Sequence, residues 1–376
     1  GERAGRGLKL LSLAAITGAA VKFAETGLRL WPSSAASATY IGGSGVAYIG
    51  TNLSPALLSV GYIVGLNIAV LIFLGGVISW GIAIPIYSGW LLPGDAALWG
   101  EYQSGAGAAD LAFSIWTSKI RFLGVGAMLV GGIWALLSMR GSLLTGIRSG
   151  LQQHAKNGDL LPHTEADTPM KFVLSGIAVF VIPIFVLYQS IVASIGVGLV
   201  MTLIMVVTGF LFSSVAAYMA GLVGSSNNPI SGVTIATILF ASLLLLWMTG
   251  GAAIGPAAAI MIGAVVASAA AIAGDNMQDL KAGFILGATP WKQQLMQGLG
   301  VISSVLVMAP ILNLLLLAYG IGVPTDEHPN PLLAPQATLM QSVADGVFTG
   351  ELPWGMVTIG AAVGIGIIII DEVLIA

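Results

Sequence analysis

Long apolar runs dominate this chain, and short polar stretches separate them. Several runs reach the roughly 20 residues that an α-helix needs to cross the hydrocarbon core of a bilayer. The pattern predicts spans over 8–30, 119–139, 172–189, 192–212, 233–248, 256–273, 299–321 and 354–370. The run 55–87 is too long for one straight helix, so we expect a half-helix followed by a full span. The sequence thus predicts an all-α polytopic membrane protein, a bundle of roughly eight to nine transmembrane helices with re-entrant or broken helices.

The composition agrees with a chain that is surrounded by lipid. Of its 376 residues, 57% are hydrophobic and only 8% are charged, whereas a soluble domain carries about 25% charged residues. There is no cysteine, which excludes disulfides and thiolate metal sites. We therefore expect the lipid bilayer as its surroundings, a multi-pass location in the cell membrane (the inner membrane of a prokaryote), no cofactor and no nucleic-acid partner.

The positions of lysine and arginine predict the orientation, because cytoplasmic loops carry the basic excess. Loops 140–171 and 274–297 contain basic residues, whereas 88–118 and 322–353 contain acidic residues and no basic ones. We expect the first two to be cytoplasmic loops and the last two to be external. The orientation of the N-terminal part stays open. Its basic residues would lie in the cytoplasm only if the chain crossed the membrane an odd number of times before residue 88.

A polar stretch, GSSNNPISG (224–232), stands between two strongly apolar runs. Irregular backbone at membrane depth is tolerated only where protein or a water-filled cavity supplies hydrogen-bond partners, and many transporters bind their solute at such breaks. We expect 213–232 to be a broken or re-entrant segment. Asn227, Asn228 and Ser231 would bind solute, and Pro229 and Gly232 would shape the break. An ordinary polar turn at the membrane surface is an equally good interpretation.

A second polar stretch, AGDNMQDLK (273–281), follows a very apolar span. If it is helical, Asp275, Gln278 and Asp279 share one face. Carboxylates at the edge of a membrane helix can bind and release protons, because desolvation raises their pKa. Asp275, Asp279 and Lys281 are thus candidates for gating or proton coupling. The alternative, which the charges favour, is a solvated cytoplasmic loop in which Lys281 balances the acids.

Three weaker candidates lie elsewhere. Glu25 follows Lys22 by three residues within the apolar run 8–30, which makes the pair a second candidate for proton coupling. In the external loop 322–353, residues 334–346 could form a short amphipathic helix, and Gln336 is a candidate solute contact. The polar break at 48–67 precedes a glycine-rich helix.

Enzyme motifs are wanting. The sequence has no phosphate-binding loop of the Walker type. The histidines, His154, His163 and His328, lie in polar stretches without metal-ligand spacing. We expect neither catalysis nor a metal site.

Four stretches together resemble the oligopeptide transporter (OPT) family, in its prokaryotic branch. They are SPALLSVGYIVG (54–65), GLVGSSNNPISGVTI (221–235), GDNMQDLKAGFILGATPWKQQ (274–294) and LLAPQATLMQ (332–341). The resemblance implies a secondary active importer driven by proton co-entry, with small peptides or metal chelates of amino-acid-like ligands as solutes. The NPG and KIPPR blocks of the eukaryotic peptide branch are absent, so both solute classes stay open.

Family members are typically longer, the chain starts without methionine, and it stops within the run IIIIDEVLIA. We therefore expect residues 1–376 to be a single transporter domain, truncated at both ends and covering the middle and later part of a longer protein. Its partners would be lipid, a small-molecule or peptide substrate, protons and, as an option, further copies of itself. The rival interpretation is a passive channel that uses the same breaks to line a pore.

Overall fold

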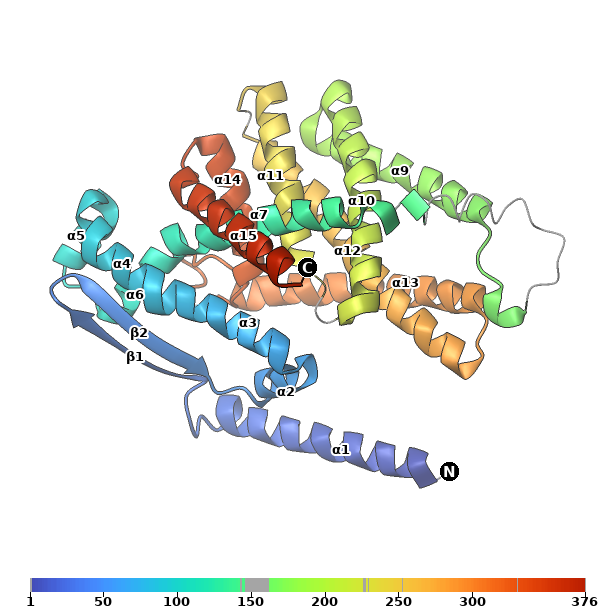
Figure 1. Ribbon diagram of the computed structural model, residues 1–376, viewed down its shortest axis with the longest axis horizontal. Helices are drawn as coiled ribbons and strands as arrows, with labels where there is room; N and C mark the ends of the chain where they lie inside the picture. Colours follow the sequence, from blue (N-terminus) through green and yellow to red (C-terminus); the bar gives the residue numbers. More distant parts are fainter. Residues whose placement is uncertain are drawn as a thin grey trace. The chain divides into compact units, whose positions relative to one another are not determined.

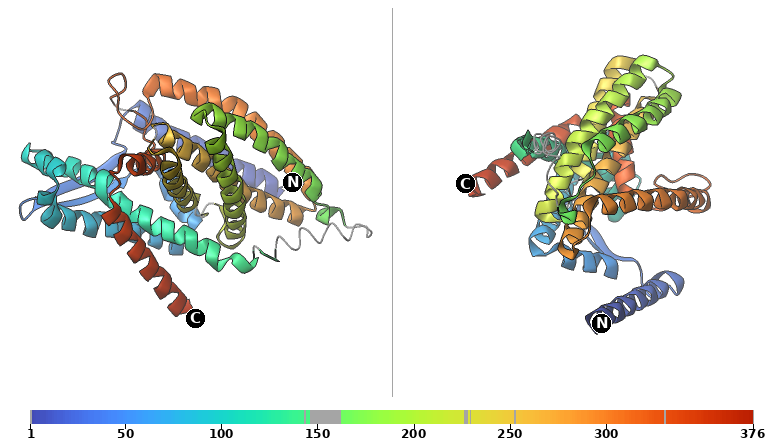
Figure 2. Two further views of the ribbon diagram at one scale, coloured as in Figure 1. Left: turned by 90° about the horizontal axis from the view of Figure 1, so that it is seen from above. Right: turned by 90° about the vertical axis from the view of Figure 1, so that its right-hand side faces the viewer.

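The computed structural model describes residues 2–142, 144–145, 162–225, 228, 230–251, 253–329 and 331–375. Its chain forms two compact units, Gly1–Phe122 and Leu123–Ala376 (Figures 1 and 2). Nine of the described helices are long and apolar enough to cross a membrane. The predicted all-α polytopic class is confirmed.

The candidate spans are Gly5–Gly27, Leu66–Gly94, Ala108–Ser138, His163–Val192, Ile195–Gly221, Ile230–Thr249, Gly255–Leu286, Pro290–Tyr319 and Trp354–Leu374. Most match the predicted runs with longer ends. As expected, the region from residue 55 divides into a short helix, α2 (Pro55–Val64), and a full-length one. The predicted span at 119–139 begins earlier, at Ala108, because polar residues such as Asp110 and Ser114 are accommodated within the helix.

The first unit contains several helical segments, some of which follow one another without a break, such as α3 to η4 (Leu66–Gly94). They are α1 (Glu2–Lys22), η1 (Phe23–Gly27), α2, α3 (Leu66–Gly76), η2 (Val77–Ala83), α4 (Ile84–Ile86), η3 (Tyr87–Leu91), η4 (Leu92–Gly94), α5 (Ala96–Gln103), α6 (Ala108–Ile115) and η5 (Trp116–Ile120). Four of them, η1, η2, η3 and η5, are π-helical turns. Such turns are rare in proteins as a whole, but many of those that occur lie at functional sites.

An antiparallel hairpin, β1 (Ser34–Ile41) and β2 (Gly45–Asn52), was not predicted. Ser88 holds it against the helices: its hydroxyl accepts from the Val46 amide at 2.8 Å, and its carbonyl accepts from the Ser44 hydroxyl at 2.8 Å. Tyr48 of β2 contacts the Trp80 ring at a centroid distance of 4.7 Å. The hairpin is thus an integral part of the first unit.

An ion pair joins the start of α5 to η5 in the first unit. Asp95 caps α5 through the Leu98 amide, and its carboxylate pairs with Lys119 at 2.7 Å and accepts from the Tyr87 hydroxyl at 3.1 Å. Burial raises the pKa of Asp95, but the hydrogen bond and charge of Lys119, with the other two donors, outweigh it and hold the pKa below its ordinary value.

This ion pair makes the stability of the first unit depend on pH. Because the folded pKa of Asp95 is lowered, its contribution is present above the ordinary carboxyl pKa and is lost as pH falls through the folded value. We expect Asp95→Asn to lower the free energy of unfolding by roughly 1–2 kcal/mol at neutral pH. The difference from wild type should shrink when thermal unfolding is followed below about pH 4. A difference that is constant with pH would contradict the charge pairing.

The second unit contains α7 (Arg121–Ser138), η7 (His163–Glu165), α9 (Met170–Val192), α10 (Ile195–Val223), α11 (Ile230–Thr249), α12 (Gly255–Leu286), α13 (Pro290–Tyr319), α14 (Pro335–Thr349) and α15 (Trp354–Ile375). Helices α12, α13 and α14 each begin with a proline in their first turn, where its missing N–H is harmless. Gly287 ends α12 in the left-handed conformation, which glycine adopts readily.

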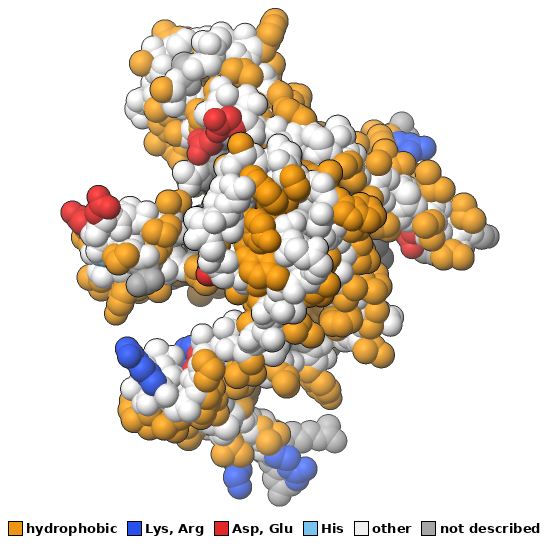
Figure 3. Space-filling view, turned by 90° about the vertical axis from the view of Figure 1, so that its left-hand side faces the viewer, with side chains coloured by type: hydrophobic (Ala, Val, Ile, Leu, Met, Phe, Trp, Pro, Cys, Tyr) orange, Lys and Arg blue, Asp and Glu red, His pale blue; other side chains and the backbone are white. Residues whose placement is uncertain are grey.

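The core of the second unit lies among α9, α10, α11 and α12. Its fully buried side chains include Tyr188, Met201, Leu245 and Ile262. Helix α11 is the most enclosed span. By contrast, α13 has no buried residue, and Tyr188 is the one buried residue of α9. Figure 3 shows hydrophobic side chains exposed over much of one face, with charged groups at a few places. Lipid tails can cover such surfaces, which is why they need no polar side chains.

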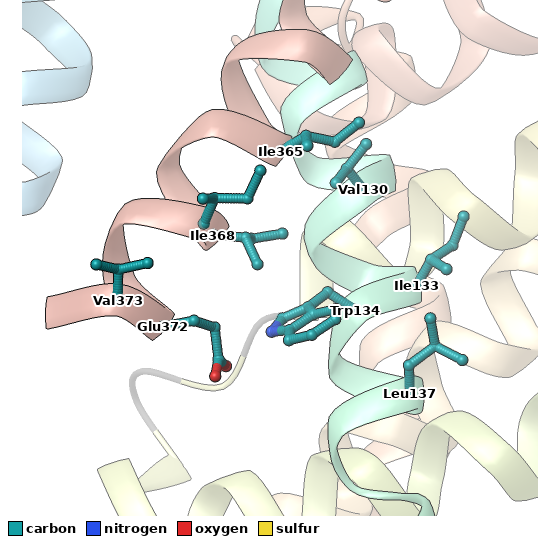
Figure 4. Close-up of a pocket in the computed structure, with 9 residues that line it drawn as sticks. Val130, Ile133, Trp134, Leu137, Ile365, Ile368, Glu372 and Val373 are labelled. Atoms are coloured by element: carbon teal, nitrogen blue, oxygen red, sulfur yellow. The ribbon is translucent and has the colours of Figure 1, made fainter. Parts of the chain in front are cut away.

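Helices α7 and α15 cross at contacts between glycines and backbone. A Cβ atom on Gly126 would overlap the Val357 carbonyl oxygen, and one on Gly360 would overlap that of Leu123. Small residues let membrane helices approach this closely. Beyond the crossing the helices leave a groove of about 470 Å³, which Leu137 and Val373 line near their C-terminal ends (Figure 4). The two helices therefore run in the same direction, as the predicted loop orientations require.

The structure also places the two predicted breaks of this unit. Residues 213–223 continue α10 rather than forming a half-helix, so the irregular part of 213–232 begins at Gly224. The predicted helix at 334–346 is present as α14, whose buried Leu339, Val343 and Val347 face α11 and α12. At 15 residues, or about 22 Å, α14 is shorter than a full span.

Candidate functional site

The predicted helix break at 224–232 lies between α10 and α11. Helix α10 ends at Gly224, whose φ is 84°, and α11 begins at Ile230. The backbone N–H of Asn228 donates to the Ser225 carbonyl at 3.3 Å, and the backbone carbonyl of Asn228 accepts from the Ile230 N–H at 2.8 Å. Of the predicted contacts, Asn227 and Pro229 lie outside the described residues.

The Asn228 side chain lies against α12. A Cβ atom on Gly274 would stand 2.6 Å from Asn228 Nδ2, so only glycine leaves room for the amide there. Both Nδ2 and Oδ1 of Asn228 are buried, and neither has a hydrogen-bond partner among the described residues. A buried polar group left without a partner costs about 1–3 kcal/mol. With respect to the described residues, the Asn228 side-chain amide therefore has both a free donor and a free acceptor, at a place where burial makes a hydrogen-bond partner stabilising.

Polar side chains of α12 continue this cluster. Gln278 lies one helical turn beyond Gly274 on the same face, and its Oε1 accepts from the Ser225 hydroxyl. The Oδ1 atom of Asn276 is also buried and unpartnered within the described part of the chain, but Asn276 stands two residues from Gly274 and so lies on the other side of α12. The two polar stretches that the sequence separates by some 40 positions meet in space through Gly274 and Gln278. We call Ser225, Asn228, Gly274 and Gln278 the break cluster.

The break cluster lies at the end of α10 and the start of α11, and about 29 Å along α12, which continues to Leu286. The 29 residues of α10 extend about 44 Å, which exceeds the roughly 30 Å hydrocarbon core. From the start of α12 at Gly255 to Gly274 the helix rises about 29 Å, which is close to the thickness of the hydrocarbon core. By the predicted orientation this is the cytoplasmic end.

The other two predicted contacts in the break have different surroundings. Gly232 is buried, and an added Cβ would lie 3.3 Å from the Met128 carbonyl oxygen of α7. Its position is explained by close helix packing. Ser231, next to it, is half-buried in the first turn of α11.

The predicted acidic face of α12 is helical, but its members point to different neighbours. Asp279 Oδ2 accepts from Gln297 Nε2 of α13 at 3.0 Å. Asp275 is exposed, with neither an ion pair nor a hydrogen bond to a described residue. Lys281 lies over the Phe284 ring at 5.4 Å and, within the described chain, forms no ion pair with the acids. Charge balance by Lys281 therefore gains no support from a direct contact.

The two loops predicted to be cytoplasmic contact each other beside α13. The Trp291 amide donates to the Ala166 carbonyl at 3.2 Å, and Gln294 Nε2 donates to Asp167 Oδ1 at 2.8 Å. His163 Nε2 lies 3.3 Å from the Gly287 carbonyl oxygen. Loops on one side of a membrane can meet in this way, and loops on opposite sides cannot.

Gln336 and Glu25 stand apart from this cluster. Gln336 is exposed at the start of α14 and has no hydrogen bond to a described residue. Phe348, near the C-terminal end of α14, packs against Gly255 at the start of α12. Gly255 and Gly274 are separated by about 29 Å along α12. Glu25 belongs to the first unit, where it is 8% exposed and pairs with Lys22 at 3.0 Å. That pair lines a groove of about 740 Å³ between α1 and α2.

Gly274 and Asn276 were not singled out from the sequence. An asparagine just after an alanine-rich span was a usable signal, because polar residues near membrane helices need partners. Gly274 carried no such signal, since glycine is frequent in the apolar helices of this chain.

Comparisons with known proteins agree on one family. The family model described as OPT oligopeptide transporter protein matches residues 3–376. A protein of Haemophilus influenzae described as "Putative oligopeptide transporter" is 31% identical over 394 residues, which is 98% of this chain and 60% of the relative. The chain thus spans about three fifths of the length of that relative. No solved structure matches.

Proposed function

This chain belongs to the OPT oligopeptide transporter family, and from that premise we propose that it forms part of a secondary active, proton-coupled importer. Its solutes would be small peptides or related amino-acid-like compounds, metal chelates included. A transporter role follows from the family; the coupling ion and the solute class are the proposal.

The observation that carries the proposal is the buried side-chain amide of Asn228 in the break cluster, which has no hydrogen-bond partner among the described residues. A primary amide offers donors and an acceptor, which match the carbonyl and N–H groups of a peptide bond. The first turn of α11 adds free amides that favour a carboxylate. A solute that satisfies these groups would recover the free energy that their burial costs.

Asp275 and Asp279 are the proposed proton-coupling residues, because they stand on α12 directly beside the cluster. Asp279 also bonds to α13 through Gln297, so a change in its protonation would alter the contact between two spans. The pair Glu25 and Lys22 in the first unit is the second candidate.

Uptake into proteoliposomes that contain the full-length protein tests the function. We expect trialanine, glutathione or a ferric chelate to accumulate above its outside concentration only under an inward proton gradient. A protonophore should abolish the accumulation. Solute that merely equilibrates, with or without the gradient, would identify a passive channel instead.

Asp279→Asn separates coupling from binding. The amide keeps an oxygen that can accept from Gln297, so the helices should stay in contact, but it cannot carry a proton. We expect gradient-driven accumulation to fall at least about tenfold, which corresponds to about 1.4 kcal/mol, while solute exchange across the membrane without a gradient persists. Lys292→Gln, a neighbouring charge change, is the control. Full accumulation by Asp279→Asn would remove this residue from the coupling step.

A further inference from the structure

One edge of the hairpin in the first unit has no partner strand. β1 and β2 form a two-stranded sheet, and seven of the eight β1 residues are exposed. β2 contacts η2, η3, α4 and α6, whereas β1, besides its pairing with β2, contacts mainly α6 among the described elements, and in Figure 1 β2 lies on the helix side of the hairpin. The outer edge of β1 is therefore the open one.

The register tells which backbone groups this edge presents. The Leu53 amide donates to the Ser33 carbonyl, so Ser33 and Leu53 form a hydrogen-bonded pair just before the ladder that starts at Ser34 and Asn52. Hydrogen-bonded and non-hydrogen-bonded pairs alternate in an antiparallel ladder. Odd-numbered residues of β1 therefore face β2, and the even-numbered ones direct their N–H and C=O groups outward. The Val46 amide, which faces Ser88 instead of β1, agrees with this parity.

The outward groups belong to Ser34, Ala36, Ala38 and Tyr40. Among the described residues these groups form one hydrogen bond, a long one of 3.4 Å that the Thr39 hydroxyl donates to the Tyr40 carbonyl. Lipid cannot satisfy such groups. Soluble proteins block free edges with charges, prolines or bulges, yet β1 reads SAASATYI in an unbroken register. The small side chains leave the edge sterically open.

Negative charge stands at one end of this edge. The Tyr40 hydroxyl donates to the Ala106 carbonyl at 2.6 Å, and its ring meets that of Tyr102 at 5.5 Å. Glu101 directly precedes Tyr102 in α5, and Asp110 lies in the first turn of α6. Burial, then Tyr102, Glu101 and Asp110 raise the pKa of Tyr40. A strand added antiparallel to β1 would begin at this end. Its terminal ammonium group would then approach Glu101 and Asp110.

We infer that the free edge of β1 is a second site for the peptide solute, in the first unit, in addition to the break cluster of the second unit. It binds the peptide by strand addition, with the peptide antiparallel to β1 and its N-terminus at the Tyr40 end. This inference rests on the proposed function for the class of solute. From Ser34 to Tyr40 the edge extends about 20 Å, which accommodates an extended peptide of up to about six residues. Recognition through the backbone accepts many side chains, because hydrogen bonds of the main chain supply the affinity.

Proline at an outward position tests the edge without breaking the hairpin. Ala38→Pro removes an outward N–H while the ladder to β2 keeps its donors, a placement that edge strands tolerate. Ala38→Ser keeps the N–H and is the matched control. With the full-length protein in nanodiscs, we expect Ala38→Pro to weaken equilibrium binding of radiolabelled tetraalanine at least about tenfold and Ala38→Ser to change it less than about twofold.

Methylated peptides give a second measurement that needs no variant. In a bound peptide strand, alternate backbone amides point toward β1. We therefore compare two tetraalanine peptides, one N-methylated at the second residue and one at the third. One of the two should lose binding and the other should keep it. Equal loss for both peptides would overturn strand addition, as would wild-type binding by a folded Ala38→Pro. Edge-to-edge crosslinking of two copies through β1 would overturn it too. Binding without gradient-driven accumulation would leave the edge site in place and refute the transport proposal.

Discussion

Gly126→Val is expected to abolish the packing of α7 on α15. The added side chain would overlap the Val357 carbonyl oxygen, and the nearest atoms are backbone, which cannot rotate away. Overpacking costs about 1–3 kcal/mol where side chains can adjust, and we expect at least the upper end of this range here. The measurement is the thermal midpoint of the purified protein in detergent, with the yield of monodisperse protein as a second readout.

Gly131→Val provides the control on the same helix, because nothing lies within 4 Å of a Cβ atom at that position. It should leave the thermal midpoint nearly unchanged. Gly360→Val, on the other side of the crossing, should repeat the loss seen with Gly126→Val, since its Cβ would overlap the Leu123 carbonyl oxygen. Equal midpoints for Gly126→Val and Gly131→Val would show that the helices do not cross at these glycines.

Asn228→Leu is expected to stabilise the protein while it abolishes transport. Leucine has a similar shape and needs no hydrogen bonds, so the substitution removes a buried amide without partners among the described residues. The free energy of unfolding should rise by about 1–3 kcal/mol. Such a gain at the expense of activity is characteristic of a site that keeps polar groups unpaired for a ligand.

Ser242→Ala is the matched control for this substitution. Ser242 lies on α11, twelve residues beyond its start, and its buried hydroxyl is also unpartnered in the described structure. Its removal should leave transport intact with a small change in stability. A large loss of stability in Asn228→Leu would instead mean that the Asn228 amide holds the structure together.

The helices were predictable because their signal is local. Each apolar run of sufficient length needs an α-helix to satisfy its own backbone groups in lipid. The end of α10 was harder to predict. SSVAAYMAGLV (213–223) is rich in small residues, which suggested a separate half-helix, but it contains no proline and its Ala216 and Ala220 pack in the helix interface. Small residues there serve close packing with α12 instead of ending the helix.

The hairpin was missed although its sequence carried a signal. Gly42 and Gly43, with φ values of 61° and 101°, form the turn between segments that contain Tyr40 and Val46. The many alanines and serines of β1 are poor strand formers, which hid this pattern. The break cluster was only half predictable: Asn228 stood out as a polar residue between apolar runs, but its contact with Gly274 depends on how α10, α11 and α12 pack.

The most direct test of the account is the rate of solute uptake under an inward proton gradient by Asn228→Leu, measured in proteoliposomes beside wild type and Ser242→Ala. If the amide of the break cluster binds the solute, Asn228→Leu should lose at least about tenfold in rate, while Ser242→Ala matches wild type and both variants remain folded. If Asn228→Leu transports at the wild-type rate, the stretch between α10 and α11 is an ordinary turn and the solute binds elsewhere.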